Sequence, residues 1–153
     1  MERNRATIEA MRLLTFDEVL GALPGLDPAT RCGPWPIAQA LEHCAQSIEL
    51  SLTCYPRLRA WPVRHLVGPL VKRRFLARGF MKHDLGAQLP EAPALDPHAA
   101  LPSAVARLRQ AIAAFRAHPG ALAPHLAYGA CTKAEYEALH AMHLADHLSG
   151  AES

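Results

Sequence analysis

The sequence has few aromatic residues and little net charge. Phe, Trp and Tyr make up 6% of its 153 residues, and the formal net charge is +2 at pH 7. Proteins that bind nucleic acids usually carry a stronger basic bias and aromatic side chains on which bases stack. We therefore do not expect DNA or RNA as a partner.

Long apolar runs are also missing. No stretch approaches the ~20 residues needed to span a bilayer. Charged residues interrupt the opening segment, MERNRATIEAMRLL, where a signal peptide would need an apolar stretch. The sequence thus predicts a cytoplasmic protein without a membrane partner.

Cysteine pairs and nucleotide-binding motifs are absent as well. Four cysteines, at positions 32, 44, 54 and 131, form no Cys-x-x-Cys pair. Such spacing is typical of reduced structural thiols rather than of a disulfide frame or a zinc ribbon. Neither a Gly-rich phosphate loop nor a serine in a nucleophile elbow occurs, so the histidines are the chemically distinctive residues.

The sequence does contain clear helical periodicity. Apolar residues recur at steps of three and four, and Thr15 to Glu18 and Thr132 to Glu135 form capping boxes that begin two helices. With half of its residues hydrophobic, the chain is long enough for one core, so we predict a single domain over residues 1–153. Its helices are expected at about 15–23, 36–55, 64–80, 101–117 and 133–149.

The fold class that follows is all-α. Four long helices in a small chain favour a four-helix bundle, with the helix at 15–23 as a short N-terminal addition. Residues 81–102 are rich in Pro, Ala and Gly and lack periodicity, which indicates a long crossover connection. Gly68 and Pro69 fall inside the helix at 64–80, where they could shift its start or kink it. No alternating strand pattern is longer than a few residues.

Histidines follow one face of the last helix. At about 3.6 residues per turn, His140, His143 and His147 share an arc with Tyr136. His143 and His147 are four residues apart and can direct their imidazoles at a common ion, which would satisfy one nitrogen of each ring. A His-x-x-x-His pair also occurs by chance in many helices, so the pair alone does not establish a metal site.

A zinc-like catalytic site usually has a third protein ligand. His43 is the only histidine of the helix at 36–55 and is the candidate, although periodicity places it at the edge of the apolar face. That position suits a ligand in an open cleft, and it equally suits a half-exposed histidine without a role. The other histidines lie in or beside loops, where we expect solvated or turn-capping side chains: His65, His83, His98, His118 and His125.

Two segments resemble conserved blocks of a known superfamily. Residues 33–51, GPWPIAQALEHCAQSIELS, resemble the first block of the DinB-like (YfiT-like) metalloenzyme superfamily, and more narrowly an uncharacterised domain-of-unknown-function branch of it. Residues 125–136, HLAYGACTKAEY, are similar to that branch's His-Pro-Phe-Phe-Gly-x-Leu-Thr-x-x-Glu-Trp. The two blocks occur in the expected order, and the resemblance covers about residues 12–150.

The resemblance implies a DinB-like four-helix bundle whose metal ligands are His43, His143 and His147. It also implies a homodimer and a divalent ion such as nickel, zinc or iron. Characterised relatives include metal-dependent transferases and isomerases that use low-molecular-weight thiols. The chain departs from the branch at Leu126, where a proline is usual, and at Asp146, where the branch has a second adjacent histidine. These departures affect residues around the triad and leave the triad intact.

Two functions remain open. The first is a divalent-metal-dependent enzyme, thiol transferase-like or hydrolase-like, in which the ion activates a thiol or water against a small-molecule electrophile. In it His140 would act as an acid or base or support a ligand, and Asp146 or Glu42 would orient a ligand's free N–H. The second is a non-catalytic helical dimer whose histidines are vestigial or hold a structural ion.

Overall fold

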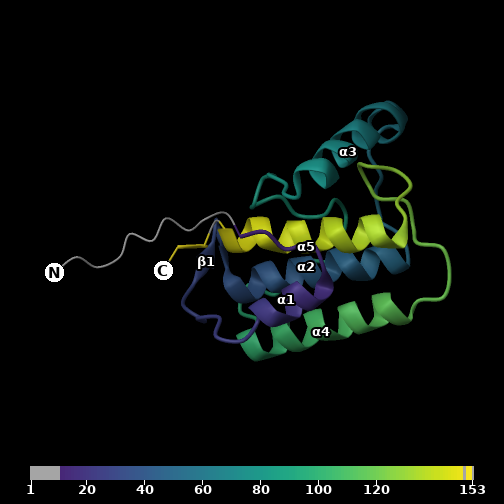
Figure 1. Cartoon of the computed structure of the whole chain (residues 1–153). Helices are drawn as coiled ribbons and strands as arrows, with labels where there is room; N and C mark the ends of the chain where they lie inside the picture. Colours follow the sequence, from purple (N-terminus) through teal and green to yellow (C-terminus); the bar gives the residue numbers. More distant parts are fainter. Residues whose placement is uncertain (1–10, 150, 153) are drawn as a thin grey trace.

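The computed structural model describes residues 11–149 and 151–152, and within them the chain is mostly helical. The all-α class expected from the sequence is thereby confirmed. In the part of the chain described, no helix combines the length and apolar character that crossing a bilayer requires. The elements shown in Figure 1 are, in chain order, α1 (Phe16–Ala22), β1 (Arg31–Cys32), β2 (Trp35–Pro36), α2 (Ile37–Leu52), the π-helical turn η1 (Val63–Val67), α3 (Gly68–Arg78), α4 (Leu101–Ala117), α5 (Lys133–Ser149) and β3 (Ala151–Glu152).

Side-chain caps begin α1 and α5. The Thr15 hydroxyl accepts a hydrogen bond from the Glu18 N–H at 3.2 Å, and the Glu18 carboxylate accepts one from the Thr15 N–H at 3.0 Å. Thr132 and Glu135 make the same reciprocal bonds at the start of α5, at 3.1 and 2.9 Å. Both boxes satisfy N–H groups that a helix leaves unpaired in its first turn, and so they fix where each helix begins.

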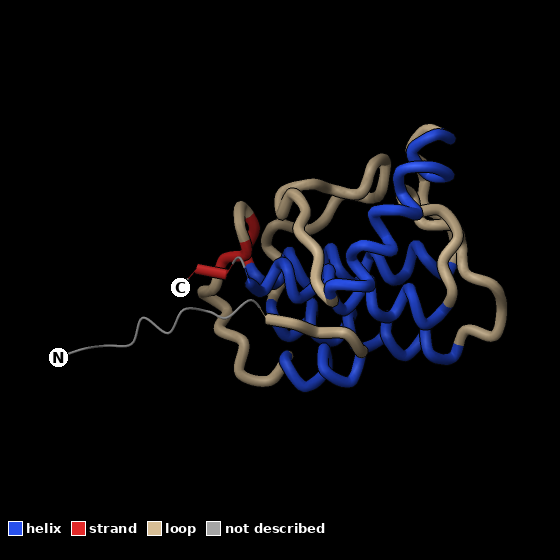
Figure 2. The backbone as a smooth tube through the Cα atoms, turned by 45° about the horizontal axis from the view of Figure 1, so that its top comes forward, coloured by secondary structure: helices blue, strands red, loops and turns tan. Residues whose placement is uncertain are grey.

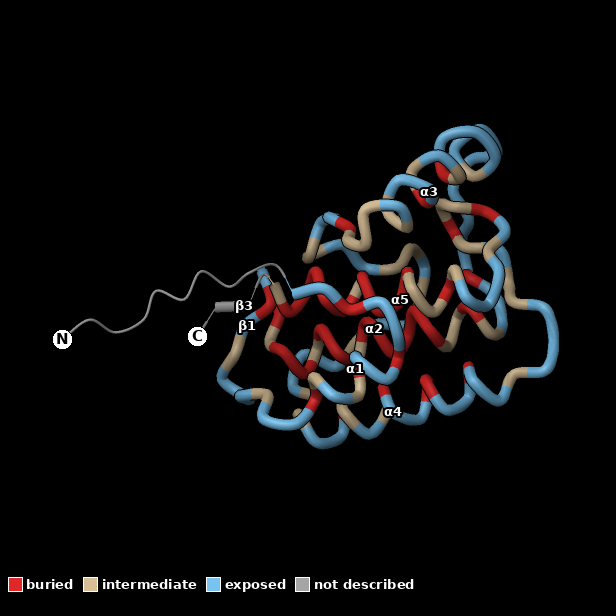
Figure 3. The backbone as a smooth tube through the Cα atoms, in the orientation of Figure 1, coloured by how far each residue is buried: buried red, intermediate tan, exposed pale blue. Residues whose placement is uncertain are grey.

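The core lies between α2, α4, α5 and the short α1. Helix α2 packs against α4 and α5, and α1 packs against α5. The buried stretches are concentrated on α2 and α5, the two helices that carry the candidate ligands (Figure 3). The largest fully buried apolar side chains include Phe16, Ile37, Leu41, Leu108, Ile112, Phe115, Tyr136, Met142 and Leu144.

Helix α2 ends at Leu52, before the expected boundary at residue 55. A proline clashes with the carbonyl four residues earlier and disfavours the helical conformation of the residue before it. Pro56 would clash with the Leu52 carbonyl and disfavours a helical conformation at Tyr55, so the helix ends before Tyr55. The Ser51 carbonyl, near this end, accepts a hydrogen bond from the Ala123 N–H at 2.9 Å.

The helix expected at 64–80 is a π-helical turn followed by α3. Pro69 has no N–H to donate to the carbonyl four residues before it, and the Gly68 N–H bonds instead to the Val63 carbonyl, five residues back. A Cβ at Gly68 would lie 1.9 Å from the Ala127 carbonyl oxygen. Only glycine therefore allows this close approach between the turn and the loop before α5.

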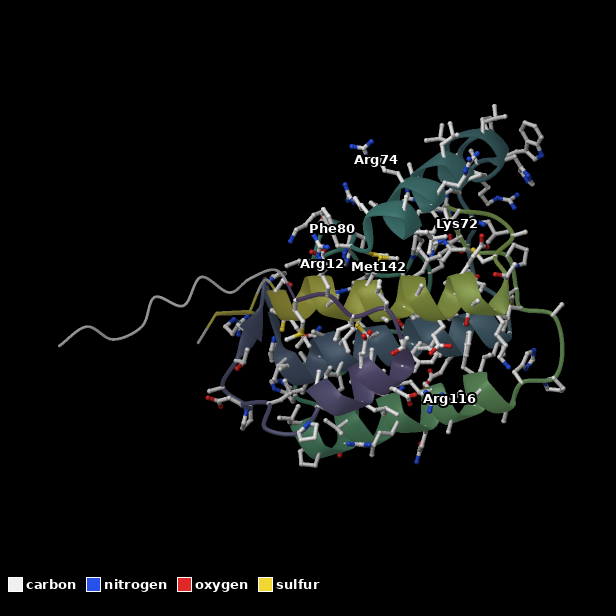
Figure 4. The ribbon with its side chains drawn as sticks, viewed as in Figure 1. Arg12, Lys72, Arg74, Phe80, Arg116 and Met142 are labelled. Atoms are coloured by element: carbon white, nitrogen blue, oxygen red, sulfur yellow. The ribbon has the colours of Figure 1, made fainter. Side chains whose placement is uncertain are left out.

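Helix α3 leans away from the other helices (Figure 2), and it contacts α5. The Lys72 ammonium donates to the Glu135 carboxylate at 2.8 Å and to the Ala130 carbonyl at 2.9 Å. Figure 4 shows Lys72 beside the start of α5 and Arg74 on the side of α3 that faces away from it. Beyond α3 the chain returns over α5, where Met81 packs on Met142 and its apolar neighbours.

A small antiparallel sheet of order β2-β1-β3 joins the segment before α2 to the segment after α5. Gly33 begins the two-residue turn between β1 and β2 with a φ of +61°, a conformation that glycine adopts without strain. The turn places the buried Trp35 directly before α2. Trp35 is thereby fixed at the end of the helix pair that carries the histidines.

Candidate metal centre

Three histidines from two helices meet in the interior. His143 and His147 lie one turn apart on α5, and His43 comes from α2. One ring nitrogen of each lies within 4.8 Å of those of the other two. The ring centroids are 5.0 Å apart for His43 and His143, 5.4 Å for His43 and His147, and 5.0 Å for His143 and His147. The structure thus brings together the three residues that the sequence singled out.

The three imidazoles are held in the neutral form. His43 is 2% exposed, His147 is fully buried and His143 is half-buried. Burial, and secondarily the charge of His83, lowers the pKa of His43 to about 4 and the pKa of His147 to about 3, with His43 adding to the effect on His147. Burial, and then the neighbouring histidines, also places the pKa of His143 well below its ordinary value. At neutral pH each ring therefore keeps a lone pair that can bind a cation.

Two buried nitrogens of this cluster have no hydrogen-bond partner in the described part of the chain. They are the Nδ1 atoms of His43 and His147. Leaving a polar atom buried without a partner is costly, so such a site needs a ligand, a water or an ion nearby. Neutral nitrogen donors that converge from two helices suit a divalent first-row ion, and the donor set fits the metal that the sequence implied.

Trp35 covers the cluster on one side. Its ring meets His43 edge-on at 5.0 Å and stacks on His147 at 5.8 Å. Trp35 is itself 7% exposed, so this side of the centre is closed to solvent by an apolar ring. The effect is a low-polarity environment in which charge on an ion would interact strongly with its ligands.

A fourth histidine, His83, joins the cluster from the loop between α3 and α4. Its Nε2 lies 3.3 Å from Nε2 of His147, and its ring centroid lies 4.6 Å from that of His143. Its Nδ1 lies 2.7 Å from the Asp146 carboxylate, which also accepts the His83 backbone N–H at 2.9 Å. The expectation of a solvated or turn-capping side chain was wrong for His83. No periodic signal marked it, because a loop residue reaches a site only through the path of the folded chain.

The supporting residues proposed from sequence have other partners. Asp146 orients His83 rather than a member of the triad. Glu42 pairs with Arg107 of α4, which also bonds to Glu49 at 2.7 Å. Glu42 therefore links α2 to α4 instead of contacting the centre.

His140 lies in the aromatic part of the core. Its ring stacks on Tyr136 at 5.3 Å and meets Phe115 edge-on at 5.9 Å. Its Nε2 lies 3.3 Å from the Ser51 hydroxyl, which itself donates to the Ile48 carbonyl. Nε2 is therefore the donor in this contact, and burial lowers the pKa of His140 to about 3. His140 is therefore held by packing and one hydrogen bond, and it lines the edge of the cavity described below.

The remaining loop histidines are outside the cluster. His125 caps a turn, because its Nδ1 accepts the N–H groups of Ala127 and Tyr128 at 3.1 and 3.2 Å. His65 and His98 are exposed. His118 Nε2 lies 3.4 Å from the Ala121 carbonyl in the turn after α4.

A cavity of about 220 Å³ opens beside the histidines. His43, His83 and His143 line it together with His140. Most of the remaining wall is apolar, which is typical of a pocket for a small organic molecule. The apolar lining residues include Met81, Leu89, Leu126, Tyr128 and Leu139.

The cysteines are free and do not contribute to the cluster. Burial raises the pKa of Cys32 and of Cys131 to about 11, and it raises the pKa of Cys44 as well. These thiols therefore stay protonated at neutral pH and are poor nucleophiles and ligands.

Comparison with known proteins identifies a family but no characterised relative. The family model described as "Protein of unknown function (DUF1569)" matches residues 14–152. No curated protein and no solved structure matches the chain.

Proposed function

We propose a function from the site itself, because the chain belongs to DUF1569, a family of proteins of unknown function. The proposal is a divalent-metal-dependent enzyme that uses a three-histidine centre for a thiol transferase-like or hydrolase-like reaction. The observation that carries it is the set of three neutral imidazoles, each with one ring nitrogen within 4.8 Å of a ring nitrogen of the other two. Protein interiors rarely tolerate such a set without an ion to use its lone pairs.

His43, His143 and His147 would hold the ion. A bound divalent ion there would lower the pKa of a coordinated water or thiol toward neutrality and so supply a nucleophile. The chain's own contribution is to present the imidazoles unprotonated and to exclude water with Trp35. Nickel, zinc and iron are all compatible with nitrogen donors.

The substrate would occupy the cavity of about 220 Å³. Its apolar wall, from Met81, Leu89 and Leu139 among others, suits the carbon frame of a small electrophile or thiol. His43 and His143 line this cavity and would place the reacting group next to the ion. His140 also lines the cavity, but its Nε2 already contacts Ser51, which supports a positioning role more than proton transfer.

The wider assignment is to the DinB-like superfamily, as a single domain. The long connection between α3 and α4 and the position of the triad on α2 and α5 support it. Free cysteines support a cytoplasmic location, where thiols stay reduced. We also propose a homodimer, in which a second copy covers the exposed apolar side chains of η1 and α3.

The competing function is a non-catalytic helical dimer with a structural ion. The tight burial of His43 and His147 is the observation that favours it, because structural sites are closed whereas catalytic sites keep an open position. The cavity next to His143 favours the enzyme. A screen of metal-loaded protein for conjugation of cellular thiols to electrophiles separates the two. If the metal-loaded protein turns over none of these substrates, the structural role is favoured.

The first experiment is a metal analysis of protein purified without a histidine tag. We expect close to one ion per chain after loading with Ni²⁺, Zn²⁺ or Fe²⁺, and loss of that ion in His143→Ala. His65→Ala is the matched control, since it removes an exposed histidine. Failure of the wild-type protein to retain any of these ions contradicts the proposal.

A further inference from the structure

His83 is oriented by its neighbours toward the three-histidine cluster. Its backbone N–H and its Nδ1 both bond to Oδ2 of Asp146, at 2.9 and 2.7 Å. A carboxylate only accepts hydrogen bonds, so Nδ1 carries the ring hydrogen and Nε2 presents a lone pair. That lone pair lies on the side of His147, whose Nε2 is 3.3 Å away.

The separation of the two Nε2 atoms matches a shared ion. Imidazole nitrogens bind zinc-like ions at about 2.0–2.1 Å, so two of them on one tetrahedral ion are about 3.3–3.4 Å apart. The His83 ring also lies beside His143, with centroids 4.6 Å apart. His83 therefore contacts two of the three proposed ligands and lines the same cavity as His43 and His143.

We propose that His83 is a fourth ligand of the ion and that Asp146 is the residue that positions it. The inference rests on the metal centre of the proposed function. A carboxylate on the far nitrogen of a ligating histidine is the common means by which proteins fix its tautomer and orientation. Asp146 is 4% exposed, and Lys82 holds its other oxygen at 2.9 Å. Both carboxylate oxygens of Asp146 therefore have a partner, His83 on Oδ2 and Lys82 on Oδ1.

The fourth ligand differs from the others in the element that carries it. His43, His143 and His147 come from packed helices, whereas His83 lies in the loop that follows α3. Four imidazoles complete a tetrahedral ion, so a substrate would bind as a fifth ligand or take the place of one histidine. His83 is the ligand that can leave without disturbing the packing of α2 on α5.

Cobalt binding tests this assignment without a substrate. Untagged wild-type protein, His83→Ala, Asp146→Asn and His143→Ala are titrated with Co²⁺, and the dissociation constant and the visible absorption are recorded. We expect His83→Ala to bind at least about tenfold more weakly and to shift the visible bands of the four-imidazole site, because a water would take the place of one imidazole. Asp146→Asn should weaken binding by about tenfold, as substitutions that remove a ligand's orienting partner do, and keep those bands. His65→Ala, an exposed histidine, should match the wild type.

The outcomes separate this inference from the proposed function. Wild-type protein that binds no ion contradicts both. An ion that His143→Ala loses, but that His83→Ala binds with an unchanged constant and spectrum, contradicts only the fourth ligand. Nitrogen-15 NMR of the zinc-loaded wild type counts the metal-bound imidazoles without any substitution, so it tests the inference even if a variant misfolds. Four metal-bound imidazoles support the inference, and three overturn it.

Discussion

At the scale of single residues, the environment decides what each histidine does. His143 and His140 lie three positions apart on α5, yet one faces other imidazoles and the other packs among Tyr136 and Phe115. The helical spacing placed both on one face, and it could not distinguish them. The distinction comes from what α2 and α4 present opposite each ring, which only the packed structure defines.

Trp35 should report on metal binding. Its ring lies 5.0 Å from His43, so a bound paramagnetic ion such as Ni²⁺ should quench its fluorescence strongly. The sequence has two tryptophans, and Trp61→Phe leaves Trp35 as the only one, whose emission can be excited separately from that of tyrosine. We expect most of the emission of Trp61→Phe to disappear as one equivalent of Ni²⁺ is added.

Trp35→Phe is the matched control for that measurement. It leaves Trp61, which is 60% exposed and stacks on His65. Its emission should change little at the same Ni²⁺ concentration. Equal quenching in the two variants would place the ion somewhere other than the three-histidine cluster.

The buried neutral histidines should make the metal-free protein sensitive to acid. Burial lowers the pKa of His125 to about 4 and that of His140 to about 3, from an ordinary 6.5. Below pH 6.5 the unfolded chain binds protons that the folded chain excludes, so stability falls as the pH drops toward the folded-state pKa. Each such group accounts for up to about 1.4 kcal/mol per pH unit, or about 2 kcal/mol between pH 6.5 and 5.

Urea unfolding of metal-free protein between pH 7 and 5 measures this effect. We expect the free energy of unfolding to fall with decreasing pH, and His140→Gln to show a shallower fall by up to about 1.4 kcal/mol per pH unit. His65→Gln removes an exposed imidazole and should keep the wild-type slope. A slope in His140→Gln that equals the wild-type slope would mean that His140 is not held neutral.

At the scale of elements, local signals set most helix boundaries. Helices α4 and α5 span the expected residues 101–117 and 133–149, and the two capping boxes form at Thr15 and Thr132. Hydrogen bonds between neighbouring residues determine such boundaries, so a sequence pattern can predict them. The π-helical turn at η1 was not predicted, because it also depends on the contact of Gly68 with the loop before α5.

Gly68→Ala should destabilise the protein. The added methyl group would meet the backbone of Ala127 at 1.9 Å, and backbone cannot move aside as a flexible side chain can. We expect a loss of at least about 1–3 kcal/mol, the usual cost of overpacking, measured by urea or thermal unfolding.

Gly21→Ala is the matched control at the element scale. Gly21 lies inside α1, and a Cβ there would meet nothing within 4 Å. The same substitution should therefore stabilise the protein by about 0.5–1 kcal/mol, because alanine favours a helix more than glycine does. Similar effects of the two substitutions would contradict the close approach at Gly68.

At the scale of the whole molecule, the exposed face of η1 and α3 should decide the oligomeric state. Val63, Leu66, Val67 and Leu70 follow the i, i+3, i+4, i+7 spacing of one helix face, and Leu66, Val67 and Leu70 are each more than half exposed. Such a contiguous apolar face is typical of a protein interface. Light scattering should give about twice the chain mass of 16.6 kDa for the wild type and a monomer for Leu66→Lys combined with Leu70→Lys.

The charge around this face predicts how the dimer responds to salt. Residues 56–82 hold eight of the sixteen Lys and Arg residues and no Asp or Glu. Two copies that meet here repel each other, and salt screens that repulsion. The dimer should therefore tighten between about 0.05 and 0.5 M NaCl. A wild-type protein that stays monomeric at high salt contradicts the dimer.

The sequence by itself determined the all-α class, the starts of α1 and α5, and the His143 and His147 pair, because each depends on local hydrogen bonds or on helical spacing. His43 needed the resemblance to a family, since its own helix placed it only at the edge of the apolar face. Only the tertiary structure placed His83 next to His147 and Asp146 next to His83. Their contact joins residues 63 positions apart, and its geometry depends on the path of a loop that carries no periodic signal.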